Sequence, residues 1–254
     1  MQLSGRPTAS RAAGSSRRGE RRSTDRPRCR ARRARVPRAV PGTMSTMSTS
    51  TAPRILLFIG DSITDCGRRE DPDGLGHGYV RMLAEELRAR EPDTTVLNRG
   101  ISGHKAADLV ARFEQDCLGL APDLVTVYIG VNDSWHYTTG RDEHVDEESF
   151  ERDYRWMLDQ IAEHLPGTAV TLVVPFVADV DEDVRRIHDD LDPKVAIIRR
   201  LALEHGHTLV DLEQLLAGVL ATGMPPERFA EDGVHPTPIG HRAIADAWLD
   251  AVRP

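Results

Sequence analysis

Cysteine and long apolar runs are both scarce in this chain of 254 residues. Its three cysteines, Cys29, Cys66 and Cys117, have no paired spacing, which argues against a disulfide framework and indicates a reducing compartment. No apolar run approaches the roughly 18 residues that a membrane span requires. We therefore expect a cytoplasmic protein with neither a disulfide framework nor a membrane partner.

Acidic residues are nearly absent from the first 53 positions. Thirteen arginines stand there against Glu20 and Asp25, with few large apolar residues. Burial cannot offset the ordering entropy of such a segment, so we expect residues 1–53 to be a disordered Arg/Ser-rich extension. No apolar stretch follows the paired arginines, which argues against an export signal. A start of translation at Met44 or Met47 is favoured over an arm that attracts nucleic-acid phosphates, and we expect no nucleic-acid partner.

Residues 54–254 have the size and pattern of one α/β domain. The whole chain has a net charge of −7, and because residues 1–53 sum to +11, this part sums to −18. A core of this size needs no disulfide or metal to be stable. Short β-rich runs alternate here with longer amphipathic segments, which implies right-handed βαβ crossovers and a parallel sheet between two helix layers.

The predicted elements can be placed by residue. The strands are expected at Arg54–Ile59, Thr95–Asn98, Leu124–Ile129, Ala169–Val174 and Thr208–Leu212. The helices are expected near Tyr79–Arg90, Lys105–Cys117, Glu148–His164, Pro193–His205 and Pro238–Val252. Three of the strands are nearly all apolar, as strands covered on both faces are. The prediction is a three-layer α/β/α sandwich with a five-stranded parallel sheet.

Reactive residue types follow the predicted strands. Gly60-Asp61-Ser62 comes after the first strand, the block 98–104 after the second, and Gly130-Val131-Asn132-Asp133 after the third. Asp232-Gly233-Val234-His235-Pro236 precedes the last helix. Ligands of open parallel sheets bind at the carboxyl edge of the strands. We expect these blocks to converge there, as an acyl-transfer site requires.

The four blocks, in this order, resemble the SGNH/GDSL hydrolase superfamily over essentially all of residues 54–254. The longer strings at 59–68, 98–103 and 129–135 are more similar still to those of bacterial intracellular acetylxylan esterases. The resemblance implies the flavodoxin-like SGNH hydrolase fold and esterase activity. It implies no cofactor.

The chemistry of the residues agrees with this resemblance. A serine hydroxyl attacks an ester only when a base accepts its proton, and His235 is the candidate base for Ser62. Asp232, three positions earlier, would hold the imidazole tautomer. The oxyanion hole would use the backbone N–H groups of Ser62 and Gly103 and the side-chain amide of Asn132. Gly103 lets the backbone approach substrate without an obstructing Cβ.

Each motif also has a structural interpretation. Gly-Asp-Ser alone is an ordinary turn, Asp-x-x-His before proline is often a helix cap, and Asn132-Asp133 is typical of a turn. The catalytic interpretation prevails because the motifs occur together and in order. Asp61 is expected to organise the turn, and Cys66 to be structural. We expect no metal site; the histidines regarded as bystanders are His104, His136, His188 and His241.

The substrate is predicted from the loops beyond the strands. Residues 175–193 hold seven acidic residues against Arg185 and Arg186, and such a rim disfavours anionic substrates. No long apolar lid is present, which argues against a lipase. Trp135, Tyr137 and Phe176 follow the third and fourth strands, where they either support a sugar ring or belong to the core.

These observations favour a serine esterase that removes a small acyl group, acetyl above all, from a neutral carbohydrate such as an acetylated xylo-oligosaccharide. One alternative keeps the mechanism for a broad short-chain carboxylesterase, lysophospholipase or thioesterase. Another is a binding scaffold that uses the basic tail. The expected partner is the ester substrate, and the oligomeric state stays open.

Overall fold

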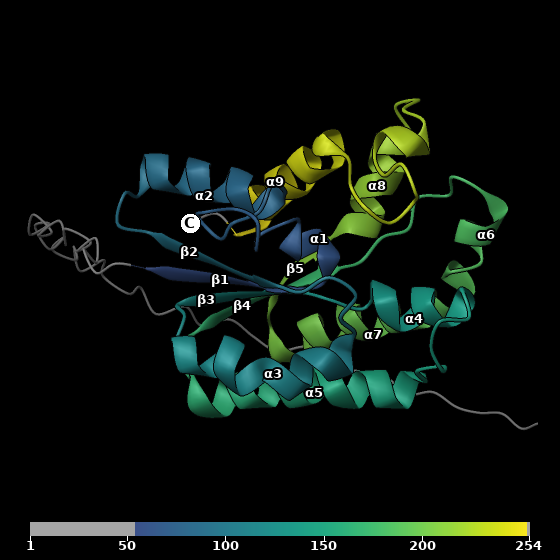
Figure 1. Ribbon diagram of the computed structural model, residues 1–254. Helices are drawn as coiled ribbons and strands as arrows, with labels where there is room; N and C mark the ends of the chain where they lie inside the picture. The colour runs from purple at the N-terminus through teal and green to yellow at the C-terminus, as the bar shows by residue number, and fades with distance from the viewer. Residues whose placement is uncertain (1–53, 253–254) are drawn as a thin grey trace, which may run out of the picture. The chain divides into compact units, whose positions relative to one another are not determined.

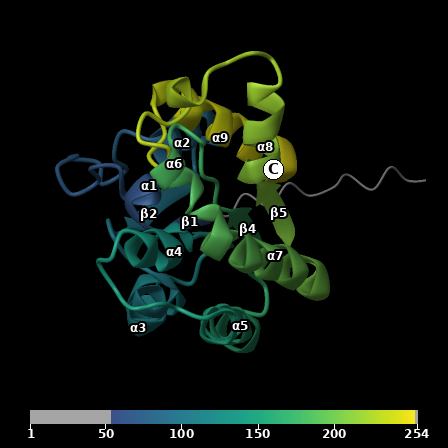
Figure 2. The same cartoon turned by 90° about the vertical axis from the view of Figure 1, so that its right-hand side faces the viewer.

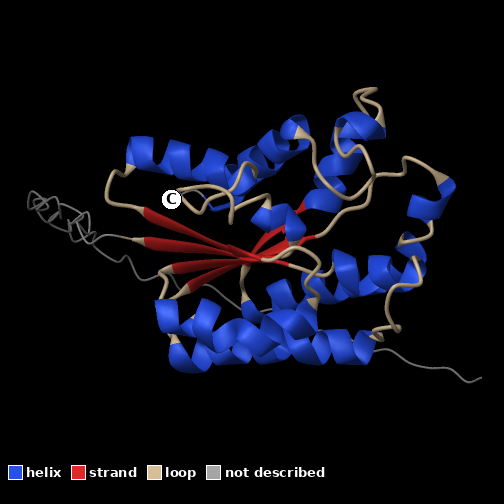
Figure 3. Cartoon of the chain, in the orientation of Figure 1, coloured by secondary structure: helices blue, strands red, loops and turns tan. Residues whose placement is uncertain are grey.

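Five parallel strands form the centre of the fold. The structure, a computed structural model, describes residues 54–252; the expectations for residues 1–53 lie outside this range. The strands are β1 (Ile55–Gly60), β2 (Thr95–Gly100), β3 (Leu124–Tyr128), β4 (Ala169–Val174) and β5 (Thr208–Asp211). They lie in the order β2-β1-β3-β4-β5, and each neighbouring pair is parallel (Figure 1; Figure 3). The predicted five-stranded parallel sheet is confirmed.

Helices cover both faces of this sheet (Figure 2). The helices on one face are α1 (Ser62–Asp65), α2 (Tyr79–Arg90), α8 (Leu212–Leu220) and α9 (Pro238–Val252), and those on the other are α3 (Ala106–Asp116), α4 (Val131–Thr138), α5 (Glu147–His164) and α7 (His188–His205). The short α6 (Glu182–Arg185) lies beyond the carboxyl ends of the strands. Short 3₁₀ turns occupy Leu118–Leu120 and Pro226–Arg228.

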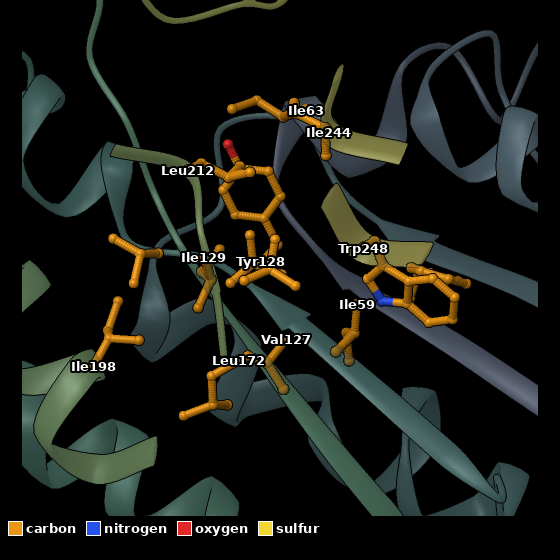
Figure 4. Close-up of a cluster of buried hydrophobic side chains, with 14 of the residues drawn as sticks. Ile59, Ile63, Val127, Tyr128, Ile129, Leu172, Ile198, Leu212, Ile244 and Trp248 are labelled. Carbon is orange, nitrogen blue, oxygen red and sulfur yellow. The ribbon is translucent and has the colours of Figure 1, made fainter. Parts of the chain in front are cut away.

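The core lies between the sheet and the two helix layers. All five residues of β3 are buried, as the nearly all-apolar run predicts for a strand covered on both faces. Figure 4 shows Ile198 of α7 and Trp248 of α9 on opposite sides of the strands. The Trp248 indole packs on Phe58 with ring centroids 5.3 Å apart, and its Nε1 donates to Thr126 Oγ1 at 2.9 Å. The buried threonine hydroxyl of β3 therefore has a partner.

The strand order places the topological switch point of the sheet between β1 and β3. The chain passes from β1 to β2 at one edge and then crosses to β3 on the other side of β1. Helices that follow neighbouring strands on opposite faces leave an opening at their carboxyl ends, where doubly wound folds bind ligands. Ser62 follows β1 and Asn132 follows β3, so two of the predicted site residues flank this opening.

The sequence analysis did not predict four short or medium-length helices. Helices α1, α4, α6 and α8 occupy segments predicted as loops or left unassigned, and Asn132-Asp133 belongs to α4 rather than to a turn. Helix α7 begins at His188, five residues before the expected Pro193. Proline favours the first position of a helix, but here Pro193 lies inside the helix and costs a single backbone hydrogen bond.

Candidate active site

Ser62 is the first residue of α1, at the point where the chain leaves β1. The Asp61 carboxylate accepts a hydrogen bond from the Ile63 N–H at 3.0 Å and so caps this one-turn helix. Gly60 makes the sharp exit possible, because a Cβ at this position would lie 2.1 Å from the Tyr128 carbonyl oxygen. The turn thus exposes the serine hydroxyl at the end of a buried strand.

Ser62, His235 and Asp232 form one hydrogen-bonded chain. Ser62 Oγ lies 2.9 Å from His235 Nε2, and His235 Nδ1 lies 2.7 Å from Asp232 Oδ2. A carboxylate can only accept, so Nδ1 carries the proton and Nε2 is free to accept from the serine. Partial burial opposes ionisation of Asp232, but its hydrogen bonds with His235 hold the pKa of this carboxyl below its usual value. The structure therefore brings together the three residues predicted as a triad.

Gly233 allows the turn that carries His235. Its φ is +82°, a conformation that side chains disfavour. A Cβ here would lie 2.5 Å from Val184 Cγ1 and 2.7 Å from the Ala178 carbonyl oxygen. The Ala178 N–H also donates to the Gly233 carbonyl at 2.8 Å. The histidine loop is consequently packed tightly against the segment that follows β4.

Hydrogen bonds connect the segments that carry the predicted oxyanion residues. The Ser102 N–H donates to Asp65 of α1 at 3.0 Å, and the Asn132 amide donates to the His104 carbonyl at 3.0 Å. Gly103, exposed and with φ +81°, lies between these two anchored residues. The loop after β2 is thereby fixed to the nucleophile's helix on one side and to Asn132 on the other.

Two buried carboxyl groups support this arrangement. Burial raises the pKa of Asp61 to about 7, and among the described residues its Oδ2 has no hydrogen-bond partner. Burial likewise raises the pKa of Asp133 to about 7. Asp133 accepts from the Ala106 N–H at 3.1 Å and so joins α4 to the start of α3. The sequence did not indicate that Asp133 joins these two helices, because Ala106 lies 27 residues away along the chain.

The three aromatic residues considered as possible sugar contacts differ in their exposure. Trp135 is partly exposed, and its ring meets the His235 imidazole edge-on with centroids 5.4 Å apart. Tyr137 is 45% exposed and packs on His144 at 4.7 Å. Phe176 is only 1% exposed and packs edge-on against Phe229 at 5.0 Å. The sugar-platform interpretation is therefore wrong for Phe176, because the chain after β4 runs beneath the histidine loop and buries this ring.

Cys66 and three of the histidines regarded as bystanders contact residues outside the triad. His241 accepts from the Tyr79 N–H at 3.2 Å and lies 3.5 Å from Cys66 Sγ, and burial lowers its pKa to about 4. Arg112 donates to His104 at 3.2 Å, and His136 lies 3.1 Å from Asp142. None of these four contacts involves the triad.

One group of possible metal ligands appears that the sequence spacing did not reveal. The ligand atoms of His188, Asp192 and Glu213 lie within 4.8 Å of one another. They already have ionic partners: His188 pairs with Asp192 at 2.8 Å and with Asp179 at 3.2 Å, while Glu213 pairs with Arg199 at 2.6 Å. The segment 182–192, which contains His188 and Asp192, is largely helical.

The acidic rim is partly neutralised in the structure. Arg186 pairs with Asp183 at 3.1 Å, and Arg185 reaches Glu182 at 3.3 Å and Asp179 at 3.6 Å. Lys194 of α7 pairs with Asp190. The field that repels anions is therefore weaker than the sequence count indicates, although acidic groups remain in excess. Within residues 54–252, no helix has the length and apolarity to cross a membrane.

Comparisons with known proteins place this geometry in a family. The model of the GDSL-like Lipase/Acylhydrolase family matches residues 58–243. An acetylxylan esterase from Geobacillus stearothermophilus is 35% identical over 206 residues, which cover 76% of this chain and 91% of that protein. An isoamyl acetate-hydrolyzing esterase 1 homolog from Rattus norvegicus is 33% identical over 128 residues, which cover 48% of this chain and 47% of that protein.

The fold of this chain is similar to those of solved structures. The crystal structure of the Geobacillus stearothermophilus acetylxylan esterase has a TM-score of 0.68 and 32% identity, covering 78% of this chain and 93% of that one. An α/β hydrolase enzyme from the metagenome of Lake Arreo, Spain, has a TM-score of 0.69 and 33% identity, covering 79% and 95%. Catalytic mutants of the Geobacillus stearothermophilus acetylxylan esterase replace a serine, an aspartate or a histidine by alanine. In that enzyme the histidine follows the aspartate by three positions. The chain belongs to the GDSL-like lipase/acylhydrolase (SGNH) family of carboxylic ester hydrolases.

Proposed function

We propose that this enzyme removes acetyl groups from a neutral carbohydrate, such as an acetylated xylo-oligosaccharide, through an acyl-enzyme on Ser62. The observation that carries the mechanism is the unbroken hydrogen-bonded chain from Ser62 through His235 to Asp232. The same three residue types are mutated in the catalytic mutants of the acetylxylan esterase, with the same spacing between the acid and the histidine.

In the first half-reaction, Ser62 Oγ attacks the acetyl carbonyl carbon while its proton passes to His235 Nε2. The carbonyl oxygen becomes an oxyanion, which the N–H groups of Ser62 and Gly103 and the Asn132 amide stabilise. Asp232 stabilises the imidazolium that forms. The intermediate then expels the alcohol oxygen, which takes the proton from Nε2, and an acetyl ester remains on Ser62.

In the second half-reaction, water replaces the alcohol. His235 Nε2 accepts a proton from the water as its oxygen attacks the acetyl carbonyl, and the same donors hold the new oxyanion. Collapse of this intermediate returns the proton to Ser62 Oγ and releases acetic acid, which ionises at neutral pH. The serine hydroxyl and the neutral imidazole are thus restored.

Two features support a small acyl group and an uncharged alcohol. The names of both relatives refer to acetate esters, of xylan in one case and of isoamyl alcohol in the other. The surface beyond β4 keeps an excess of carboxylates, which disfavours anionic alcohols such as phospholipid headgroups. A broad short-chain carboxylesterase is the second candidate, because the Rattus norvegicus relative is named for a simple alkyl acetate. A binding scaffold without activity has no support, since Ser62, His235 and Asp232 form one hydrogen-bonded chain and the chain belongs to a family of hydrolases.

A series of p-nitrophenyl esters from acetate to decanoate tests the acyl preference. We expect kcat/KM to be highest for acetate and to fall as the chain lengthens. A rise with chain length would exclude the deacetylase and favour a lipase-like or thioesterase activity. Equal rates from acetate to butyrate, with no acetate released from acetylated xylo-oligosaccharides, would favour the short-chain carboxylesterase.

A further inference from the structure

A pocket beside the triad suggests where the alcohol part of the ester binds. We propose that the pocket between α4 and α6 is the subsite for this alcohol, and that it takes an uncharged polyhydroxy group of oligosaccharide size. The inference rests on the proposed function, because it assigns the leaving group of that reaction to a defined part of the surface.

The pocket has the volume and the wall structure of a ligand site. It measures about 400 Å³, within the range of roughly 300–1,000 Å³ for small-molecule pockets. One wall consists of Trp135, Thr138 and Thr139, from α4 and the residue after it, and the opposite wall includes Asp181, Asp183 and Arg186 around α6. In Figure 1, α4 and α6 lie together beyond the carboxyl ends of the strands.

Both walls contact the segment that carries the catalytic base. Trp135 meets the His235 imidazole with ring centroids 5.4 Å apart and planes at 66°. On the other wall, Val184 lines the pocket and packs on Gly233, since a Cβ added there would lie 2.5 Å from Val184 Cγ1. The pocket is therefore next to the histidine loop rather than elsewhere on the surface.

The chemistry of the reaction is consistent with an alcohol that lies on this side. His235 Nε2 must give its proton to the leaving oxygen, so that oxygen has to come within hydrogen-bond reach of Nε2. The acyl oxygen must instead point to the predicted oxyanion donors at Gly103 and Asn132. An ester that satisfies both requirements extends its alcohol part past His235, towards Trp135 and the pocket.

The lining of the pocket is suited to hydroxyl groups. Two threonine hydroxyls, two carboxylates and one guanidinium offer both donors and acceptors. The Trp135 indole, with Val184 and Ile187, provides an apolar surface. The Asp183–Arg186 ion pair at 3.1 Å leaves Asp181 as an additional negative group. A neutral polyol can donate to these carboxylates, whereas an anionic alcohol would be repelled.

Filling the pocket from α4 tests the proposal. In Thr138→Trp, a bulky ring would occupy the space that the sugar needs. Thr222→Trp is the matched control. Thr138 and Thr222 are both exposed, and each side-chain hydroxyl donates to the carbonyl three residues earlier, at 3.1 Å and 2.7 Å. Thr222, however, does not line the pocket. Asp183→Trp fills the pocket from the opposite wall, so the proposal can still be tested if Thr138→Trp does not fold.

Each variant is assayed with two substrates and one non-reacting ligand. For acetylated xylotriose, we expect both pocket variants to lose about tenfold or more in kcat/KM, mainly through KM, a loss of uniform binding. With methyl acetate, whose alcohol is too small to reach the pocket, they should stay within about twofold of the parent. Calorimetry should show that xylotriose binds to the parent and to Thr222→Trp but not to the pocket variants.

The outcomes separate the two proposals. If xylotriose binds equally to all variants, or if the pocket variants and the control lose the same activity on acetylated xylotriose, the subsite is wrong while the esterase mechanism stands. If the parent hydrolyses methyl acetate but not acetylated xylotriose, the proposed carbohydrate substrate is wrong. In that case the binding of xylotriose alone tests the proposed subsite. Loss of xylotriose binding in Thr138→Trp supports the subsite, and failure of the parent to bind xylotriose contradicts it.

Discussion

Asp232 holds His235 at two points. Its Oδ2 lies 2.7 Å from the ring Nδ1, and its Oδ1 accepts from the His235 backbone N–H, also at 2.7 Å. One carboxylate thus fixes both the tautomer of the imidazole and the turn that presents it. The turn is further tightened by Gly233, whose positive φ brings the loop against Val184.

Asp232→Asn should separate these two roles. The asparagine oxygen can still accept from the backbone, but its amide would donate to Nδ1 and force the proton onto Nε2, where it blocks the serine. We expect kcat on p-nitrophenyl acetate to fall by about 10³–10⁴, in line with the equivalent change in a serine protease, with little change in melting temperature. An activity within tenfold of the parent would show that Asp232 does not set the tautomer.

Gly103→Ala tests the predicted oxyanion loop. Gly103 and Gly223 have similar positive φ angles, +81° and +89°, and an added Cβ meets no close atom at Gly223 and only the His136 ring, 4.0 Å away, at Gly103. Both alanine variants should therefore lose a similar stability, about 1–2 kcal/mol. Only Gly103→Ala should also lose kcat, because its N–H is a proposed oxyanion donor and the strained loop would move it.

Urea unfolding and steady-state kinetics on both glycine variants check this prediction. A loss of about tenfold or more in kcat is expected for Gly103→Ala, since removing one oxyanion donor costs about 10²–10³ and displacement costs less. Equal kcat values for the two variants would remove Gly103 from the oxyanion hole.

The buried Asp61 carboxyl should make stability depend on pH. Its usual pKa is 3.8, and burial raises the folded-state pKa to about 7. Between these values the folded state binds more protons than the unfolded state, so the free energy of unfolding falls as pH rises through this window and levels off above it. Asp61→Asn keeps an acceptor for the Ile63 N–H but cannot ionise.

Urea unfolding between pH 4 and pH 8 measures this effect. The stability of Asp61→Asn relative to the parent should grow from pH 4 to about pH 7 and then stay constant. The gain is a few kcal/mol at most, since each pKa unit corresponds to about 1.4 kcal/mol. Parallel curves for the two proteins would show that folding does not raise the pKa of Asp61.

Much of the fold follows from local sequence. All five strands and both α2 and α9 were predicted close to their observed bounds, because buried parallel strands are apolar runs and because these helices have regular one-sided apolar patterns. The position of Ser62 also follows from the sequence, since it comes directly after β1 and the carboxyl ends of parallel strands share one edge. Asp232 and His235 instead precede α9, and their place beside Ser62 follows from the family resemblance and the chemistry of the residues.

What the sequence did not reveal depends on partners far along the chain. Phe176 follows a strand as an exposed aromatic would, but Phe229 covers it. Helix α6 has only four residues, too few for a periodic pattern, and yet it forms one wall of the pocket beside Trp135. Such contacts come from tertiary packing, which apolar periodicity does not encode.

Acetate release from an acetylated xylo-oligosaccharide, compared between the parent enzyme and Ser62→Ala, decides whether Ser62 carries the acyl group. Alanine removes the nucleophile and leaves His235 and Asp232 in place, so the variant isolates this one role. We expect the parent to release acetate, and we expect kcat of the variant to fall by about 10⁴-fold or more, as in other enzymes with this triad. If Ser62→Ala releases acetate as fast as the parent, the proposed mechanism is wrong.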